Sequence, residues 1–497
     1  MSNFSEMLGK IIRDNHISIY SLAKSIACDR TRLQKVISGE RHIDMDKFVE
    51  LRKELSAFVP PETLAELYER YAQDYFGSEQ YRCIRTIKAR ITEFSAVTRF
   101  MEKNTVQKWT PALYLQRMKV TPGSREVLLQ VAELLDAEWD CAVREHRKVK
   151  LYVNIPSAWK HMKGLLLCFL TQKGMRENVD FCLVAGNSCI RCREAAFENH
   201  QETSQMDNYL THLEFASYGY NTFISHQSYY EEISEDILFP YSIVTSTACM
   251  LLSYDGELAV ATHDPEKLAD IAHRFLAVTE EKKRFLQKKD YEKIYLAMLS
   301  EGGERTQSLD IVGRFSVLPF CTEELLDKII PMYCHNRNYL LRSWGDFCGL
   351  FRMQKISMFF TLESVRDFME NKETDFFGQQ VGFSLTYPMK ITLLKELWQY
   401  FRDTESAQLY LLKENRYALQ DKFPVFCWNS RFVCSSGELY ENNTKTEAVG
   451  MFCSPSVVRN LKSFHEYMIH SEACMDKESS LKVLKGLIEK MDCATSA

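Results

Sequence analysis

The chain has 497 residues, of which 45% are hydrophobic, 12% aromatic and 26% charged. This length exceeds what one core supports, so two to four domains are expected, and the apolar content excludes a disordered chain. The formal net charge of −5 excludes a global basic field that draws the whole chain to nucleic acid. Any affinity for nucleic acid must therefore come from a local patch.

Sixteen cysteines are scattered along the chain without a repeating framework. No apolar leader segment opens the sequence, and the longest apolar run, residues 165–170, is too short to cross a bilayer. We therefore expect a cytoplasmic protein with reduced thiols, with no membrane partner and no cofactor.

Residues 17–39 are predicted to form two short helices joined by a tight turn. Ser18 and Asp29 are of the residue types that cap a helix N-terminus, and Gly39 can adopt the left-handed conformation of a C-cap. The apolar stripes of the two helices predict a shared core made by Leu22, Ala23, Ile26, Leu33 and Val36 and completed by Gly39.

The second helix of this pair has a polar face turned away from its apolar stripe. Its members are Arg30, Thr31, Gln34 and Lys35. Arginine pairs with a guanine edge, glutamine with adenine, and a threonine methyl touches a thymine methyl, while lysine and arginine also neutralise phosphates. Arg32 lies at the rim of this face, and Arg41 and His42 follow the helix within reach of a DNA backbone. The alternative is a solvated face on a module that only packs.

The same stretch resembles the helix-turn-helix of lambda-repressor-like regulators of bacterial type, the XRE class. The matching residues are Ile17-Ser18, Leu22-Ala23, Asp29-Arg30-Thr31, Leu33 and Ser38-Gly39-Glu40-Arg41, within a resemblance over about residues 4–57. The chain departs from the family at Ala27 and Cys28 in the turn and at Ile37. The resemblance implies that the second helix lies in the major groove of double-stranded DNA. It assigns DNA contacts to Ser18, Arg30, Thr31, Arg32, Gln34, Lys35, Arg41 and His42.

Two further helices are predicted around this pair, over residues 4–15 and 44–58, with Asp44 as the cap of the second. Together they complete a DNA-binding domain of residues 1–59. Pro60-Pro61 interrupts helix formation and is expected to separate this core from the rest of the chain. Deletion of residues 1–59 is accordingly expected to leave a folded body.

Residues 60–150 are interpreted as a helical connector that also offers a dimer contact, since such regulators pair to match a two-fold operator. Helices are predicted over 62–76, 79–97 and 124–145. The second of them carries four cations, which we interpret as a solvated face rather than a contact with flanking DNA: Arg82, Arg85, Lys88 and Arg90.

From residue 151 onward strands and helices alternate, which predicts a large α/β or α+β body and a multidomain chain. Residues 239–258 and 423–439 share a pattern of strand, Gly turn able to close a hairpin and second strand, each followed by an apolar helix. Two related lobes, 151–310 and 311–497, explain this pattern as well as chance does.

Motifs that carry chemistry are weak in this sequence. Cys189-Ile-Arg-Cys192 is the best metal or redox candidate, but zinc needs about four ligands, so an incidental pair is the better interpretation. Cys334-His335 is weaker. Aromatic clusters at 215–223, 226–230 and 358–360 are interpreted as core rather than as a ligand pocket. Phosphate-loop, dinucleotide-binding, hydrolase and zinc-protease motifs do not occur, so no catalytic residue and no metal site is predicted.

The function predicted from the sequence is a sequence-specific DNA-binding transcriptional regulator. Its body is expected to sense an unidentified small-molecule effector or to hold a homodimer together. Two alternatives remain open: an enzyme acting on a small molecule or nucleotide and fused to a helix-turn-helix, and a scaffold that binds other proteins. A polar pocket with perturbed titratable groups favours the enzyme, and a large exposed apolar patch favours the scaffold.

Overall fold

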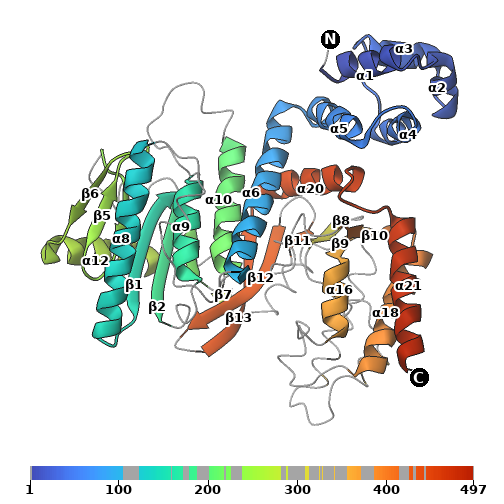
Figure 1. The fold of residues 1–497 in the computed structure, drawn as a ribbon. Coiled ribbons are helices and arrows are strands. Elements are labelled where there is room, and N and C mark those ends of the chain that lie inside the picture. The colour runs from blue at the N-terminus through green and yellow to red at the C-terminus, as the bar shows by residue number, and fades with distance from the viewer. Residues whose placement is uncertain are drawn as a thin grey trace.

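The computed structural model combines a helical N-terminal region with a body built on two mixed β-sheets (Figure 1). It describes residues 3–103, 122–157, 159–171, 178–186, 201–217, 220–224, 238–280, 287–288, 308–312, 355–370, 386–413, 425–428, 432–441 and 444–495, with four single positions besides.

The N-terminal region consists of helices that lie where the apolar periodicity predicts them. They are α1 (Asn3–Asp14), α2 (Ile19–Ser25), α3 (Arg30–Ile37), α4 (Met45–Leu55), α5 (Pro61–Phe76) and α6 (Ser78–Lys103). The predicted caps of α2 and α3 are confirmed: the Ser18 hydroxyl accepts from the Ser21 N–H, and the Asp29 carboxylate accepts from Thr31 and Arg32. These bonds satisfy amide groups that have no partner inside the helix.

The predicted role of Asp44 as a cap of α4 is wrong. Asp44 occupies the N-cap position but makes no capping hydrogen bond. Its carboxylate instead forms an ion pair with the guanidinium of Arg32, at 2.5 Å. The cationic partner, twelve residues away in α3, draws the carboxylate from the helix end.

The first sheet has the strand order β3-β2-β1-β4-β5-β6. The strands β1, β2 and β3 are parallel, and β4, β5 and β6 continue the sheet as an antiparallel meander. Helices α8 and α9 cover one face and α12 covers the other. The bounds are α8 (Pro122–Arg144), β1 (Val149–Pro156), α9 (Lys160–Leu170), β2 (Val179–Gly186), α10 (Gln201–Ser217), β3 (Asn221–Ile224), β4 (Tyr241–Val244), β5 (Cys249–Leu252), β6 (Ala259–Thr262) and α12 (Pro265–Glu280).

The second sheet has the order β10-β9-β8-β11-β12-β13-β7. Helix α20 packs on one face, and α16, α18 and α21 pack on the other. The bounds are β7 (Gln287–Lys288), β8 (Ser308–Val312), β9 (Lys355–Thr361), α16 (Leu362–Met369), α18 (Tyr387–Asp403), β10 (Ala407–Leu412), β11 (Val425–Trp428), β12 (Phe432–Glu441), β13 (Thr444–Cys453), α20 (Pro455–His470) and α21 (Lys477–Thr495).

The two sheets repeat one topology. In each, three parallel strands are ordered third-second-first, and an antiparallel meander of three strands follows on the other side of the first strand. A helix then succeeds the last strand of each meander, α12 in the first lobe and α20 in the second. The two sheets thus share one strand order over the described residues.

Only one of the two expected glycine turns is present. Gly256 has a φ of 72° and closes the turn between β5 and β6, a conformation that glycine adopts without a steric penalty. Gly437 instead lies inside β12, paired with Ala448 of β13, and the pairing of the two strands continues to Glu441 opposite Thr444. The second predicted turn is therefore wrong, because β12 continues as a ten-residue strand through that glycine.

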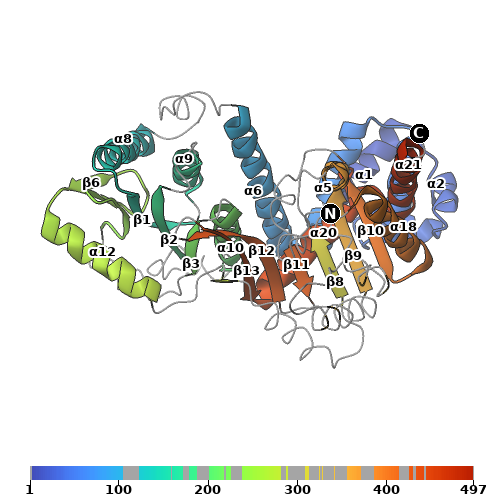
Figure 2. The same cartoon turned by 90° about the horizontal axis from the view of Figure 1, so that it is seen from below.

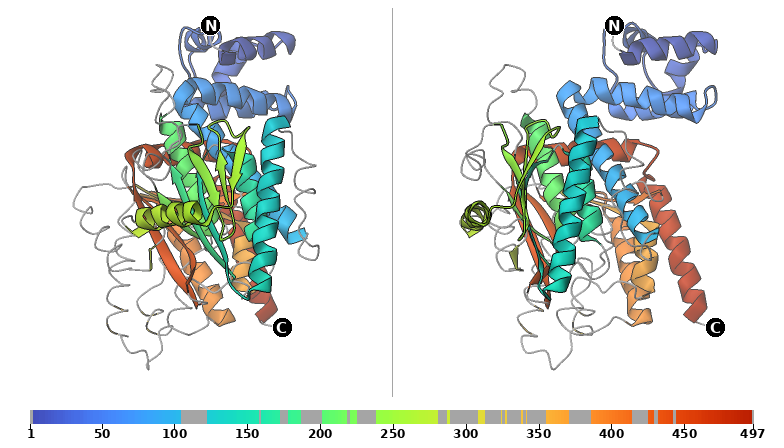
Figure 3. Two further views of the ribbon diagram at one scale, coloured as in Figure 1. Left: turned by 90° about the vertical axis from the view of Figure 1, so that its left-hand side faces the viewer. Right: turned by 60° about the vertical axis from the view of Figure 1, so that its left-hand side comes forward.

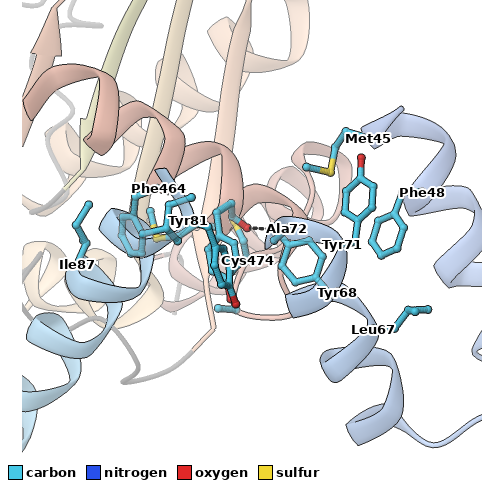
Figure 4. Close-up of a cluster of buried hydrophobic side chains, with 14 of the residues drawn as sticks. Met45, Phe48, Leu67, Tyr68, Tyr71, Ala72, Tyr81, Ile87, Phe464 and Cys474 are labelled. Atoms are coloured by element: carbon cyan, nitrogen blue, oxygen red, sulfur yellow. Dashed lines mark hydrogen bonds between the residues drawn. The ribbon is translucent and has the colours of Figure 1, made fainter. Parts of the chain in front are cut away.

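One apolar core continues across Pro60-Pro61. Phe48 of α4 stacks on Tyr71 of α5, with ring centroids 3.8 Å apart, and Tyr68 of α5 stacks on Tyr467 of α20 at 5.1 Å. Figure 4 shows this cluster, to which α4, α5, α6 and α20 all contribute. The expected separation of two cores at the proline pair is therefore not observed.

Two of the four cations on α6 that were predicted to be solvated, Arg90 and Lys88, form ion pairs within the protein instead. Arg90 is only 3% exposed and pairs with Glu214 at 2.6 Å and with Asp207 at 3.0 Å, both on α10. Lys88 pairs with Glu69 of α5 at 2.7 Å. Arg82 and Arg85 are exposed, as predicted. The acidic partners of Arg90 lie more than 110 residues further along the chain, so local charge patterning gives no sign of them.

Helices α6, α10 and α20 lie together between the two sheets (Figure 2). Phe215 and Tyr220, from one of the predicted aromatic clusters, pack on Phe181 of β2 and so fill the core of the first lobe, as expected. The cysteines whose side chains are described are all free thiols. Within the described ranges, no helix has both the length and the apolar character needed to span a membrane.

Candidate nucleic-acid interface

Helix α3 is held in place by its inner face. Leu33 and Val36 are at most 1% exposed, and they pack in the same cluster as the residues predicted as their partners on α2. The Ser5 hydroxyl of α1 also donates to the Val36 carbonyl at 2.8 Å. Five residues of the predicted core are buried, namely Leu22, Ala23, Ile26, Leu33 and Val36. Gly39, which was also expected in this core, is exposed.

The turn between α2 and α3 requires an unusual backbone conformation. Ala27 has a φ of 45°, which is disfavoured for a residue with a Cβ. The predicted left-handed conformation of Gly39 after α3 is confirmed, with a φ of 78°. One turn therefore uses the expected glycine, whereas the other accepts strain at an alanine.

The outer face of α3 is open. The side chains that the sequence singles out there are exposed, as are the two that follow the helix: Arg30, Thr31, Gln34, Lys35, Arg41 and His42. Ser18 at the start of α2 is exposed too. These residues come from the start of α2, from α3 and from the loop after α3. Together with Arg32 of α3 we refer to them as the α3 surface.

Arg32 differs from the other cations of the α3 surface. Its side chain is 38% exposed, and its ion pair with Asp44 directs the guanidinium toward the start of α4. An exposed pair of this kind is worth at most about 1 kcal/mol, so a stronger anion can displace the carboxylate. In the structure, however, Arg32 is paired within residues 1–59, which we call the head.

The head as a whole is only weakly basic, because residues 1–59 contain ten Lys or Arg and eight Asp or Glu. On the α3 surface Arg30, Lys35 and Arg41 are exposed cations. Two carboxylates lie beside them: Asp29 caps α3, and Glu40 accepts a hydrogen bond from Ser38.

Tyr20 is an aromatic residue near Ser18 that the sequence analysis did not single out. Tyr20, in the first turn of α2, is 63% exposed. Its only signal in the sequence is an aromatic residue on the otherwise polar side of a short amphipathic helix. A phenol there offers a hydroxyl to a phosphate oxygen, which is a frequent contact of DNA-binding proteins.

The helices that carry the α3 surface lie away from the sheets. In Figures 1 and 3 the helices of the head project beyond the two sheets, and Figure 1 shows α2 and α3 on the side remote from them. The described parts of the body leave the side chains on the outer face of α3 exposed.

Helix α20 joins the head to the body through polar bonds as well as apolar packing. The Arg52 guanidinium of α4 donates to the His470 carbonyl at 2.8 Å, and the Tyr68 hydroxyl of α5 donates to the Tyr467 carbonyl at 2.6 Å. Burial by itself raises the pKa of Glu69, but hydrogen bonds from Lys88, Tyr467 and Tyr81 outweigh it and hold that pKa below its ordinary value. The carboxylate is therefore ionised at the centre of the junction.

The clearest cluster of potentially catalytic residues lies under α20 in the second lobe. His465 Nδ1 is 3.0 Å from an Asp310 carboxylate oxygen, and Cys427 pairs with Asp310 across β8 and β11. Burial, aided by Asp310, raises the pKa of the Cys427 thiol well above its ordinary value. A buried, protonated thiol is a poor nucleophile.

The weak metal candidate Cys189 and Cys192 lies outside the described residues, as do Cys334 and His335. Over the part of the chain that is described, no group of three or more His, Cys, Asp or Glu side chains is arranged to hold a metal ion. The α3 surface is therefore the best-defined candidate site.

No protein-family model matches the chain, and no curated protein is significantly similar to it. The assignment of a function accordingly depends on the geometry of the chain itself.

Proposed function

We propose that the chain is a sequence-specific DNA-binding transcriptional regulator of the helix-turn-helix type, and that α3 enters the major groove of its operator. The observation that carries this proposal is the division of α3 between a fully buried apolar face and an exposed face of base-reading side chains. The exposed face combines arginine, threonine and glutamine, residue types whose side chains contact base edges.

The residues of the α3 surface then have distinct roles. Arg30 and Gln34 have the donor and acceptor patterns that read guanine and adenine edges, and the Thr31 methyl suits a thymine methyl. Lys35 and Arg41 supply phosphate contacts, which position the helix and make binding dependent on salt.

In this proposal the body is a sensory or oligomerisation unit. A small-molecule effector changes operator affinity only if it binds one arrangement of head and body better than another. Helix α20 is the element through which such a preference reaches the head, because it packs on the second sheet and also on α4 and α5.

The test is a titration of the full-length protein against labelled DNA from its own upstream region, at several salt concentrations. The double variant Arg30→Ala, Lys35→Ala should lose selective binding, and the slope of log affinity against log salt should fall by about 0.9 for each phosphate contact removed. The matched control is Lys53→Ala, which removes an exposed cation of α4 beside Arg52, at the junction with the body.

Selective binding that is lost in the double variant and retained in the control supports the proposal. Equal affinity for all sequences, or equal binding by the wild type and the double variant, contradicts it. In either of those cases the α3 surface does not read DNA.

A further inference from the structure

The last strand of the first meander, β6, has an open edge. Strand β6 pairs with β5 on one side, and among the described residues no strand pairs with it on the other. It lies at the outer margin of the first lobe (Figures 1 and 2). An edge of this kind presents unpaired backbone groups to any strand that approaches it.

The repeated topology shows what this edge accommodates. Strand β13 holds the place in the second lobe that β6 holds in the first. There the edge is occupied, because β7 pairs with β13 in antiparallel register, with Lys288 opposite Ala448. The other edge of the second sheet is also covered: the Met475 N–H donates to the Leu411 carbonyl, and the Lys413 N–H donates to the Ala473 carbonyl. The corresponding edge on β6 is thus suited to accept an added strand.

Strand β6 is short, with four residues, but it carries no residue that blocks pairing. Natural edge strands are blocked by lysine, proline, inward charges or bulges, yet residues 258–262 read Leu-Ala-Val-Ala-Thr. Leu258 and Val260 are 63% and 47% exposed, and they lie on the same face of the sheet because side chains alternate. Exposed apolar side chains beside an unprotected strand edge mark an interaction surface rather than an inert border.

The backbone of β6 fixes which groups are available. The Ser253 N–H donates to the Leu258 carbonyl, so Leu258 and, by alternation, Val260 direct their amide groups toward β5. Ala259 and Ala261 then direct their N–H and C=O groups outward. An incoming antiparallel strand must match these two alanines.

The strand is complementary to itself in that geometry. A two-fold axis through Val260 places Ala259 opposite the partner's Ala261, so that all four outward-facing groups are satisfied in each copy. The same register sets Leu258 against the partner's Thr262 and Glu257 against the partner's His263, so no like charges lie opposite each other. Val260 lies opposite its own copy, and Ala259 lies opposite the partner's Ala261. A second copy therefore fits this edge without burying a charge.

We propose that the β6 edge is the contact between two copies of this chain, and that pairing joins their first sheets into one continuous sheet. A two-fold contact of this kind is closed, so it yields a dimer and not a fibre. The dimer contact then lies at the far edge of the first lobe. It does not lie in residues 60–150, where it was expected, because helices α5 and α6 pack within the protein. The proposal does not depend on DNA binding.

The first test is the mass of the full-length protein in solution without DNA, by light scattering after size-exclusion chromatography. The wild type should have twice the mass of one chain across the micromolar range. Val260→Lys places a charge at the centre of the contact and should yield the mass of one chain. The matched control is Val143→Lys, at a residue of α8 that is 54% exposed and lies outside β6, and it should remain a dimer.

A second variant tests the register and guards against loss of folding in the first. Opposed residues of a non-hydrogen-bonded pair have Cα atoms about 4.5 Å apart, within the span that a disulfide bridges. Val260→Cys should therefore yield a covalent dimer on mild oxidation, whereas Val143→Cys and the wild type should not. A wild type with the mass of one chain, a Val260→Lys dimer, or a Val260→Cys chain that fails to cross-link overturns the proposal.

Discussion

Leu33 and Arg30 lie three residues apart on α3, yet their surroundings differ completely. The Leu33 side chain is fully buried against α2, and the Arg30 side chain is exposed on the opposite face. Substitutions at the two positions should therefore separate the stability of the head from its recognition of DNA.

Leu33→Ala should destabilise the head by about 2–5 kcal/mol, because it removes buried methyl groups and leaves a cavity that the neighbours fill only in part. Thermal or urea unfolding measures the loss. Gln34→Ala, at the next and exposed position, should change stability by no more than about 0.5 kcal/mol. Equal stability of Leu33→Ala and the wild type would mean that Leu33 is not part of the core.

Arg30→Ala should cost about 1–3 kcal/mol on the best operator and relax the preference at one or two base positions. Competition binding against single-base variants of the operator measures both effects. A uniform loss on all sequences would assign Arg30 to a phosphate. Arg32→Ala should cost less than Arg30→Ala, since the Arg32 guanidinium is already engaged by Asp44.

At the scale of elements, α20 is the helix on which head and body meet. Its C-terminal residue, His470, lies against α4, and Arg52 donates to the His470 carbonyl. Burial lowers the pKa of the His470 imidazole below its ordinary value of 6.5, and Arg52 lowers it further, against the attraction of Asp46. The neutral ring is thus the form that the junction favours.

The stability of the junction should therefore depend on pH in one direction. A histidine whose pKa is lowered on folding binds more protons in the unfolded chain, so its contribution is complete above about pH 6.5 and is lost as the pH falls through the lower folded value. His470→Gln should reduce the loss of stability between about pH 7 and pH 5, measured as the shift of the urea midpoint. An identical shift in the variant and the wild type would show that His470 is not responsible.

The elements of the N-terminal region could be predicted closely because their signals are local. Ser18 and Asp29 cap their helices through the nearest amide groups, and the apolar spacing around Leu33 is complete within two turns. The partners of Arg90 and Asp44 could not be predicted, since each ion pair depends on how helices distant in sequence pack. The turn predicted at Gly437 is wrong for a related reason, because a glycine permits a turn but does not require one.

The candidate site could be predicted better than its setting. The members of the α3 surface on the polar face of α3 were named from a helical spacing of about 3.6 residues, and the others from their position beside the helix or from the resemblance. Each member is exposed except Arg32, which is half-buried. Tyr20 was missed because exposure cannot be read from residue type. The attachment of the head to α20 was missed because nothing near Tyr68 in the sequence points to Tyr467.

At the scale of the whole molecule, the continuous core changes what a truncation should do. Removal of residues 1–59 uncovers the faces of Tyr68 and Tyr71 that pack on Phe48, and it also removes Arg52 from the end of α20. The truncated chain should elute as aggregate or unfold at a lower temperature than the full chain, contrary to what the proline pair alone predicts.

Size-exclusion chromatography and thermal unfolding of the truncated chain measure this effect. The full-length Arg30→Ala, Lys35→Ala variant is the control, because it loses only exposed cations and should behave as the wild type does. A monodisperse truncated chain with an unchanged melting temperature would restore Pro60-Pro61 as a boundary between independent cores.

The hydrogen bond from the Tyr68 hydroxyl to the Tyr467 carbonyl joins residues 399 positions apart, and this separation has a consequence for synthesis. At about 5–20 residues per second, a ribosome needs roughly 20–80 s to reach α20 after α5 has emerged. Throughout that time the side of α5 that carries Tyr68 lacks the contact with α20 and is exposed to chaperones and to neighbouring nascent chains. A prematurely terminated product ends before this side is covered, so only complete chains acquire a finished head.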